Sequence, residues 1–521
     1  MSRSHAASST GEVDEKIDAS VLIVAGVVVM GSIMSILDIT VVNVAIPTFL
    51  TEFEVDKIST VAWVVTAYTL ALAAVIPMTG WAADRFGTKR LYMLALALFT
   101  AGSVLCAMAW SIESLIAFRV VQGLGGGMLM PLGMTIMTRA AGPKRMGRLM
   151  AILGIPMLLG PIAGPILGGW LIEVATWHWI FLINLPLGIA ALIYAAFALP
   201  KDEAHPSETF DFVGMLMMSP GLALFLYGVS SIPEVGGMDH VKVWGTMLGG
   251  ALLIAAFVIY SFKPAHPLLD LRLFKNFNLT ISIVTMFLFA SAFFGGLFLV
   301  PTYLQQVGGE TALGAGLLMA PQGLGAMLTM PLAGILADRF PVGRIVPFGI
   351  AIITGGMFAL TKIDADTSNT HLMINLFILG LGMGLTMMPI MSSALRTLRP
   401  HEIARGSTLL NITQQIASSM GVATISVVLV QNREGSKALA AAEAMNKAKM
   451  AGTQPPADVL AVIAQYGESF QSVVLDDLTA SFVAAFFISC IMCGVAFLAS
   501  LLLPKKRSAD ETENATPVVI H

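Results

Sequence analysis

The sequence predicts an all-α polytopic membrane protein in which fourteen membrane-spanning helices form two six-helix halves and an inserted helical hairpin. Three observations lead to this fold class. Of the 521 residues, 56% are hydrophobic and only 12% are charged, whereas a soluble globular domain has about 25% charged residues. The chain also contains fourteen apolar runs that are long enough to cross a bilayer. Finally, a charged loop sequence follows the second run, and a similar but not identical sequence follows the tenth.

Each run holds roughly the 20 mostly apolar residues that a membrane-spanning helix needs. Polar residues 1–20 precede the first run, which is too long for the apolar part of a cleavable signal peptide. We therefore expect the first run to be the first span. The predicted spans are 21–47, 60–80, 91–109, 112–138, 147–171, 179–199, 211–230, 243–262, 277–301, 312–336, 345–361, 370–391, 404–431 and 479–503.

The distribution of Lys and Arg predicts how the chain lies in the membrane. If the N-terminus is cytoplasmic, 21 of the 29 Lys and Arg residues fall in cytoplasmic segments, seven in outer segments and one, Arg119, inside a span. Cytoplasmic loops of membrane proteins carry such an excess of basic residues. We therefore expect a multi-pass protein of the cell inner (plasma) membrane with both termini in the cytoplasm.

A repeated loop sequence divides the chain. Residues 80–90 read Gly-Trp-Ala-Ala-Asp-Arg-Phe-Gly-Thr-Lys-Arg, and residues 334–344 read Gly-Ile-Leu-Ala-Asp-Arg-Phe-Pro-Val-Gly-Arg. The two copies follow spans two and ten, so they are equivalent if two extra helices separate two six-helix halves. The predicted parts are an N-terminal tail (1–20), the first half (21–199), a linker with the inserted hairpin (200–276), the second half (277–503) and a C-terminal tail (504–521).

The second half is expected to contain one long outer loop at residues 432–478. This loop is rich in Ala, Lys and Glu, and we expect an amphipathic helix within it. The alternative is a solvated cap that has no role in transport.

The composition argues against several other classes of protein. A net charge of −3 gives no basis for nucleic-acid binding, which needs a basic surface. The eight His residues are scattered, and Cys490 and Cys493 lie one turn apart on a predicted membrane helix without further ligands. We therefore expect no enzymatic site and no metal site. A non-transporting sensor is a further alternative, but it would need a sizeable soluble output domain, which the sequence does not provide.

Two ionisable side chains are predicted deep within the spans. Asp38 lies nine residues from the outer end of span one, or about 14 Å, and Arg119 lies about 10 Å into span four. Ionisable residues inside a membrane are costly and are candidates for function by default. We expect the two to share a polar cavity, in which a proton taken up outside is released inside and a drug displaces it. The alternative is a structural ion pair that only locks two helices.

Span five has a face of small residues. Such faces let helix backbones approach closely, and a proline bends the helix. We expect a close contact that serves as a rocking joint or a seal against proton leak, with ordinary packing as the alternative. The residues are Gly154, Gly160, Pro161, Gly164, Gly168 and Gly169.

The loop at 80–90 combines flexible and charged residues. Gly80 and Gly87 are expected to permit a sharp turn, and Asp84 to accept bonds from a helix N-terminus. Arg85 and Arg90 are expected to anchor the cytoplasmic side, and a topology anchor is the alternative role for the whole loop.

Uncharged polar side chains within the spans are candidates for lining a cavity. Those in span thirteen follow a one-turn spacing, so a contact with a neighbouring helix is equally compatible with them. The candidates are Asn43, Gln122, Asn411, Gln414 and Gln415.

Four stretches resemble motifs of the major facilitator superfamily. Residues 80–90 resemble its loop motif, and residues 119–127 (Arg-Val-Val-Gln-Gly-Leu-Gly-Gly-Gly) resemble its fourth-helix motif. Residues 154–169 look like the antiporter motif of the fifth helix, and residues 37–47 (Leu-Asp-Ile-Thr-Val-Val-Asn-Val-Ala-Ile-Pro) look like the first-helix motif of drug:proton antiporters. With fourteen spans, the chain resembles the EmrB/QacA-like family of multidrug efflux transporters.

The resemblance implies a fold, an activity and partners. It implies the fold of the superfamily and the proton-coupled export of amphipathic or hydrophobic compounds by alternating access, driven by the proton gradient with no cofactor. It also implies contact with membrane lipids, a periplasmic adaptor protein as a candidate partner, and a conformational latch at Gly80, Asp84, Arg85, Gly87 and Arg90. An exporter of one physiological substrate (a lipid, siderophore or metabolite) is the alternative, and a symporter is disfavoured by the span-five motif.

Overall fold

The computed structural model is all-helical in the part of the chain that it describes. The described residues are 19–505 without 56–57, 142–151, 153, 155–159, 161–162, 165, 201–209, 236–239, 265, 366, 400–401 and 451–453. Within them, thirteen helical segments are long and apolar enough to cross a membrane. Most of predicted span five, 147–171, lies outside the described residues, although residues 166–174 are helical. The observed segments therefore agree with the other thirteen predicted spans.

The first half contains five of these long segments, of which Trp179–Ala198 comprises two helices, and one separate short helix. They are α1 (Ala19–Val44), α2 (Ile46–Glu52), α3 (Ile58–Phe86), α4 (Thr88–Ala107), α5 (Ile112–Ala141), α7 (Trp179–Leu182) and α8 (Asn184–Ala198). The inserted hairpin follows as α9 (Phe212–Val235) and α10 (Val241–Tyr260).

The second half begins after a short 3-10 helix, η1 (Leu271–Lys275). Its span twelve is broken at Thr386, three residues before Pro389, because proline has no N–H to continue the helical bonding. The helices are α11 (Phe277–Gln306), α12 (Ala312–Arg339), α13 (Val342–Leu360), α14 (Asn369–Gly384), α15 (Met387–Arg396), α16 (Ile403–Glu434), α17 (Lys437–Met450), α18 (Ala457–Tyr466), η2 (Gly467–Ser469) and α19 (Phe470–Ser500).

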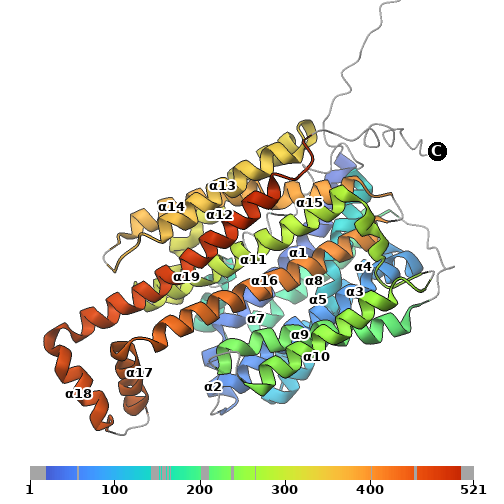
Figure 1. Ribbon diagram of the computed structural model, residues 1–521. Coiled ribbons are helices and arrows are strands. Elements are labelled where there is room, and N and C mark those ends of the chain that lie inside the picture. The colour runs from blue at the N-terminus through green and yellow to red at the C-terminus, as the bar shows by residue number, and fades with distance from the viewer. Residues whose placement is uncertain are drawn as a thin grey trace, which may run out of the picture.

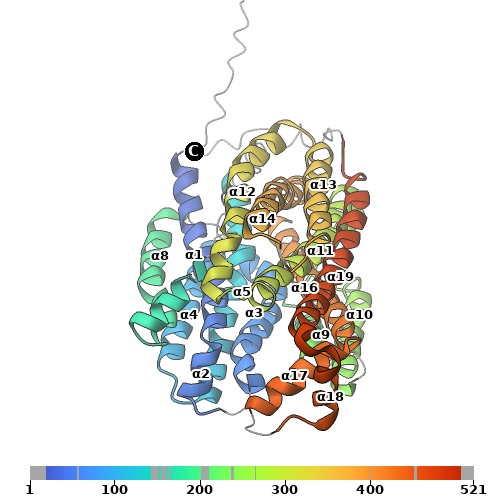
Figure 2. The ribbon, with the colours of Figure 1, turned by 90° about the vertical axis from the view of Figure 1, so that its left-hand side faces the viewer.

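The long helices form an elongated bundle in which the hairpin α9–α10 lies along one side (Figures 1 and 2). Helix α9 packs against both halves: its residues Met218 and Leu222 belong to one buried cluster with Ile76 of α3 and Ile412 of α16. Helix α10 packs mainly on α9 and exposes large apolar side chains such as Trp244 and Leu252. Since such faces are stable only in lipid, the chain is a multi-pass membrane protein.

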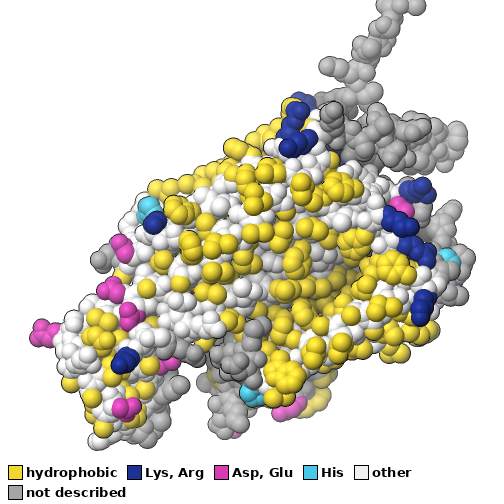
Figure 3. Space-filling view, in the orientation of Figure 1, with side chains coloured by type: hydrophobic (Ala, Val, Ile, Leu, Met, Phe, Trp, Pro, Cys, Tyr) yellow, Lys and Arg dark blue, Asp and Glu magenta, His cyan; other side chains and the backbone are white. Residues whose placement is uncertain are grey.

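Basic side chains gather at one end of the bundle. Figure 3 shows most of the visible Lys and Arg residues at this end and several Asp and Glu residues at the opposite end. We call the first the basic end, defined by Lys89, Arg139, Arg396 and Arg405, and the other the distal end, where α2, α17 and α18 lie.

The region expected to be one outer loop, residues 432–478, is mostly helical. Helix α16 continues to Glu434, α17 and α18 follow, and α19 begins at Phe470. Phe470 packs with Ala438, Ala441 and Val459 in a small apolar cluster. The region therefore does contain the expected helical structure, as two helices that pack their apolar faces against each other and against the first turns of α19.

Candidate functional site

A buried ion pair joins α1 to α5 inside the first half. The Arg119 Nη1 atom lies 2.5 Å from Asp38 Oδ2, and both side chains are fully shielded from solvent. Arg119 Nε donates to the carbonyl oxygen of Val64 on α3 at 3.0 Å. Because Asp38 and Arg119 are separated by 81 positions in the sequence, only the packing of α1, α3 and α5 brings them together.

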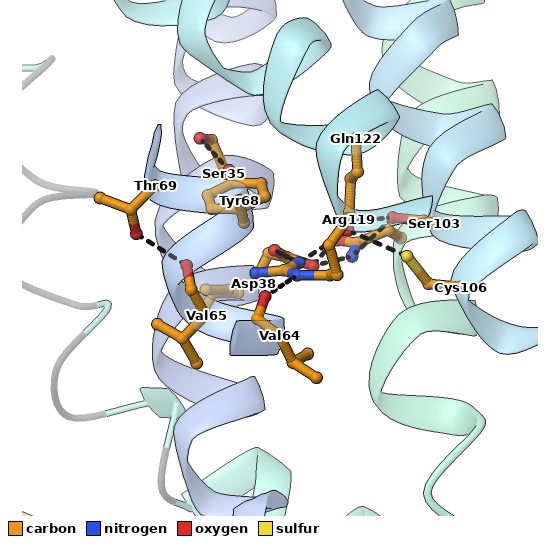
Figure 4. Close-up of polar contacts among 12 residues, drawn as sticks. Ser35, Asp38, Val64, Val65, Tyr68, Thr69, Ser103, Cys106, Arg119 and Gln122 are labelled. Carbon is orange, nitrogen blue, oxygen red and sulfur yellow. Dashed lines mark hydrogen bonds and ion pairs between the residues drawn. The ribbon is translucent and has the colours of Figure 1, made fainter. Parts of the chain in front are cut away.

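Three further polar side chains surround the carboxylate: Gln122 and Ser103, which Figure 4 labels, and Asn184. Gln122 Nε2 donates to Asp38 Oδ1 at 2.7 Å and to Ser103 Oγ at 2.6 Å. Asn184 Nδ2 donates to Asp38 Oδ1 at 3.3 Å and to Ser103 Oγ at 3.2 Å. The Asp38 carboxylate thus accepts bonds from an arginine and two amides, drawn from α5 and α8.

Aromatic rings cover the guanidinium group. Arg119 Cζ lies 4.0 Å from the centroid of the Tyr68 ring and 5.9 Å from that of Phe181. The Tyr68 hydroxyl in turn lies 3.2 Å from Ser35 Oγ on α1. A cation over an aromatic face is stabilised electrostatically, so Tyr68 helps to hold the positive charge away from water.

The energetics of such a pair depend on keeping both charges. Taking two charges out of water costs several kcal/mol per ion, and good geometry with added hydrogen bonds is needed to offset that cost. Removing one partner costs roughly 3–5 kcal/mol, because the other charge is left buried and uncompensated.

A cavity of about 750 Å³ lies between the two halves toward the distal end, and we call it the distal cavity. Five helices line it: α1, α9, α11, α12 and α16. Its lining is mostly apolar with scattered uncharged polar groups. The lining residues are Ile39, Thr40, Asn43, Val44, Val229, Ser230, Phe294, Leu297, Phe298, Pro301, Gln305, Ala315, Gly316, Met319, Ser418, Ser419, Val422 and Ala423.

The residues that were expected to line a cavity lie in different parts of the structure. Asn43 lines the distal cavity. Gln122 does not, because its side chain is fully buried beside Asp38. Asn411 is also buried, and its amide donates to the Ser407 carbonyl oxygen within α16 and to Met134 Sδ on the neighbouring helix α5.

Gln414 and Gln415 are half-buried on α16 and are not among the residues that line the distal cavity. Asp38 and Arg119 do not line the distal cavity either, so the polar site that they were expected to share is not this cavity. They do meet, but in the closed interior of the first half. The reason is that α4 and α8 supply polar partners on that side.

Helix α1 nevertheless connects the ion pair with the distal cavity. Thr40 and Asn43 follow Asp38 by two and five residues, which places them about 160° and 140° around the helix from it. One face of α1 therefore carries the carboxylate and the other lines the cavity. A shift or rotation of this helix would alter both sites at once.

The two halves contact each other at the basic end. Asp84 of α3 lies near Arg139 of α5 (3.6 Å) and near Arg405 of α16 (3.8 Å). Beside this contact, Thr135 Oγ1 lies 2.9 Å from Ser407 Oγ. Helix α16 of the second half is thereby bound to α3 and α5 of the first half.

The expected turn at Gly80 is wrong, because Gly80 lies inside α3. Its lack of a side chain serves close packing instead: a Cβ there would lie 3.1 Å from Thr408 Oγ1 and 3.3 Å from the Ala404 carbonyl oxygen. The turn occurs only at Gly87, whose φ of 86° favours glycine. Arg85 is the basic residue in the last turn of α3, and Arg90 is exposed near the start of α4.

The second copy of the loop sequence forms a related contact in the second half. Asp338 of α12 pairs with Arg396 of α15, as Asp84 pairs with Arg139. At the position of Gly87 the second copy has Pro341, with a φ of −62°. The two turns therefore follow different backbone paths.

The described glycines of span five pack closely against neighbouring helices. A Cβ at Gly160, Gly164 or Gly168 would lie 2.1–3.2 Å from an atom of Ile36, Thr40 or Val41 on α1, and one at Gly154 would lie 2.1 Å from Met330 of α12. Span five thus approaches α1 beside the cavity lining. Gly169 has no such neighbour within 4 Å, and Pro161 lies outside the described residues.

Sequence reasoning missed several members of the buried network. Ser103, Tyr68 and Cys106 were not singled out as partners of Asp38 and Arg119, although Cys106 Sγ lies 3.6 Å from Gln122 Oε1. Their signal is weak because single Ser, Tyr or Cys residues are common in spans. Asn184 had a stronger signal, since an amide in an apolar span requires a bonding partner.

The chain is similar in sequence to several known proteins. The profile described as Major Facilitator Superfamily matches residues 28–422. The Multidrug resistance protein B homolog of Mycobacterium tuberculosis is 45% identical over 500 residues, which are 95% of this chain and 92% of that protein. The Multidrug export protein EmrB of Haemophilus influenzae is 30% identical over 408 residues, 78% of this chain and 79% of that protein.

Solved structures are similar in fold. A double-tryptophan mutant of XylE gives a TM-score of 0.61 at 12% identity, over 95% of this chain and 98% of that chain. The human organic anion transporter MFSD10 gives a TM-score of 0.57 at 15% identity, over 91% and 99%.

Proposed function

This chain belongs to the major facilitator superfamily, and on that basis we propose that it is a proton-coupled antiporter that exports amphipathic or hydrophobic compounds. The observation that carries the proposal is the buried pair of Asp38 and Arg119. The sequence similarity to proteins named for multidrug resistance and multidrug export supports the choice of substrates.

In the proposed mechanism, α1 couples the proton to the substrate. A proton that binds Asp38 removes the negative charge opposite Arg119, which changes the packing of α1 against α5. Because the far face of α1 lines the distal cavity through Thr40 and Asn43, the change alters the substrate site. A bound substrate acts in reverse and favours release of the proton, since coupling between two sites is reciprocal.

We propose that this structure corresponds to the outward-facing state. The contacts of Asp84 and Thr135 with α16 close the basic end, while the cavity lies toward the distal end. Cytoplasmic loops carry the excess of Lys and Arg, so we assign the basic end and both termini to the cytoplasm, with the chain in the inner membrane. The contact at Asp84 then acts as a latch that breaks when the halves rock to the inward-facing state.

The proposal is tested by transport in vesicles with an imposed pH gradient. Purified protein is reconstituted, and export of a hydrophobic dye and the accompanying proton flux are measured for the wild type and for Asp38→Asn. We expect Asp38→Asn to lose gradient-driven export by at least tenfold. Asp270→Asn is the control, because Asp270 lies away from the ion pair and its side chain caps η1 by accepting from the amide of Arg272.

Full gradient-driven export by Asp38→Asn would end the proposal. The direction of the pH-dependent flux separates antiport from symport. Profiling of many compounds separates a multidrug exporter from an exporter of one physiological substrate, since only the latter would be limited to one chemical scaffold.

A further inference from the structure

The wall of the distal cavity contains no charged residue among the eighteen described residues that line it. The polar groups on it are hydroxyls and amides, such as Ser230, Ser419, Asn43 and Gln305. Predicted span five, which approaches α1 beside the cavity, carries no ionisable residue from 149 to 172. The wall therefore offers hydrogen bonds and apolar surface, without a fixed charge.

Two charged residues on the helices that line the cavity are already engaged in other contacts. Asp38 is fully buried and paired with Arg119 on the other face of α1. Arg433, at the end of α16, donates to Gln306 Oε1 and lies over the Phe482 ring. A cation that entered this cavity would lose water and find no carboxylate on the lining, which is costly. An uncharged amphipathic molecule would keep its hydrogen bonds and bury apolar surface.

The inserted hairpin supplies part of this wall. Val229 and Ser230, near the distal end of α9, line the cavity together with residues of both halves. Val229 packs with Ile232 and with Ala423 of α16 in an apolar cluster, and α9 also packs on α3. Helix α9 thus packs against α3 and α16 and forms one wall of the cavity.

We propose that the distal cavity selects uncharged amphipathic compounds and that α9 of the inserted hairpin is one of its selecting walls. This inference rests on the proposed function only in taking the cavity as the substrate site. It assigns Ser230 and Asn43 as specificity-determining residues.

Binding is measured directly so that transport is not required. Full-length protein in lipid nanodiscs is titrated with Nile red, an uncharged dye, and with ethidium, a permanent cation. We expect Nile red to bind at least tenfold more tightly than ethidium. Equal or tighter binding of ethidium would overturn the inference, as would a failure of Nile red to bind. Neither result bears on proton coupling, which the Asp38→Asn experiment tests separately.

A charge placed on the wall should change the preference. Asn43 is exposed to the cavity, so Asn43→Asp adds a hydrated carboxylate with little change in volume. We expect ethidium binding to tighten at least fivefold. The control is Asn278→Asp, which adds the same charge at the start of α11, away from the residues that line the cavity, and should leave ethidium binding unchanged. An unchanged ethidium affinity in folded Asn43→Asp would contradict the assignment of Asn43.

A bulky side chain on α9 should obstruct the site. We expect Ser230→Trp to weaken Nile red binding at least fivefold, because the indole occupies part of a cavity of about 750 Å³. The matched control is Leu224→Trp, on an exposed face of the same helix, which should bind Nile red like the wild type. If Ser230→Trp also binds like the wild type, α9 is not a selecting wall.

Discussion

The two halves of this transporter differ most at the position of the buried carboxylate. Asp38 lies nine residues before Pro47 in the first half, and Ala292 lies nine residues before Pro301 in the second. The fourth helices of the two halves align through their glycines. Leu376 lies four residues before Gly380, just as Arg119 lies four residues before Gly123. Ala292 and Leu376 are buried in an apolar cluster. At these two positions the first half thus has a buried ion pair, whereas the second half has buried apolar side chains.

At the basic end the halves are much more alike. Asp84 pairs with Arg139, and Asp338 pairs with Arg396 in the corresponding place. The contrast teaches that the repeat retains its charged loop contacts in both halves, while the ion pair in the core belongs to the first half. This difference agrees with the proposed mechanism, in which the loop contacts hold and release the two halves and the buried pair couples the first half to a proton.

The largest expected effect comes from fixing the two unlike halves to each other. Thr135 Oγ1 and Ser407 Oγ are 2.9 Å apart across the contact, close enough for a disulfide between cysteines at these positions. We expect oxidised Thr135→Cys/Ser407→Cys to lose dye export by at least tenfold and to regain it on reduction. Either single variant serves as the control, and peptide mass spectrometry verifies the bond. Wild-type export by the cross-linked protein would show that the halves need not separate there.

The next effect tests the ion pair itself. Arg119→Met leaves the Asp38 carboxylate buried without its cation, so we expect a loss of about 3–5 kcal/mol in unfolding free energy. Adding Asp38→Asn should recover most of that loss, because no buried charge then remains. Thermal unfolding in detergent measures both variants. If the double variant is as unstable as the single one, packing of the Arg119 side chain, and not its charge, stabilises the first half.

A third test places a charge in the second half, at the position equivalent to Asp38. Ala292→Asp places a carboxylate at the equivalent buried position within an apolar cluster, so we expect a loss of several kcal/mol. Ala292→Ser, whose hydroxyl can bond to the preceding turn, should cost much less. Equal stability of Ala292→Asp and the wild type would mean that the second half can also hold a buried charge.

The sequence alone was sufficient for the thirteen spans that the structure describes and for the meeting of Asp38 with Arg119. A bilayer imposes length and apolarity on every helix, and the rise per residue places Asp38 and Arg119 at one level. The sequence alone did not predict which residues surround Asp38 and Arg119. Which way a side chain points around its helix depends on how α1, α4, α5 and α8 pack. This is why Ser103 was missed and Gln122 was expected in the cavity.

The turn at the basic end shows the same limit in the backbone. Two glycines in one short segment, Gly80 and Gly87, predict a turn equally well from composition. Packing decides between them, since Gly80 lies against Ala404 and Thr408 of a helix that is far away in the sequence. A glycine required for close approach cannot be distinguished from a glycine required for a turn until the neighbouring helix is known.

The smallest expected effect sharpens the comparison at these two turns. Gly87 has a φ of 86°, a conformation that costs another residue of order 1–3 kcal/mol, so Gly87→Ala should lower the unfolding free energy by that amount. Pro341, its counterpart, has a φ of −62°, and Pro341→Ala should cost only about 0.4–1 kcal/mol through the greater freedom of the unfolded chain. Thermal unfolding of both variants shows which substitution lowers the unfolding free energy more. If Pro341→Ala costs as much as Gly87→Ala, the second turn depends on its proline for more than backbone entropy, and the two copies are equally constrained.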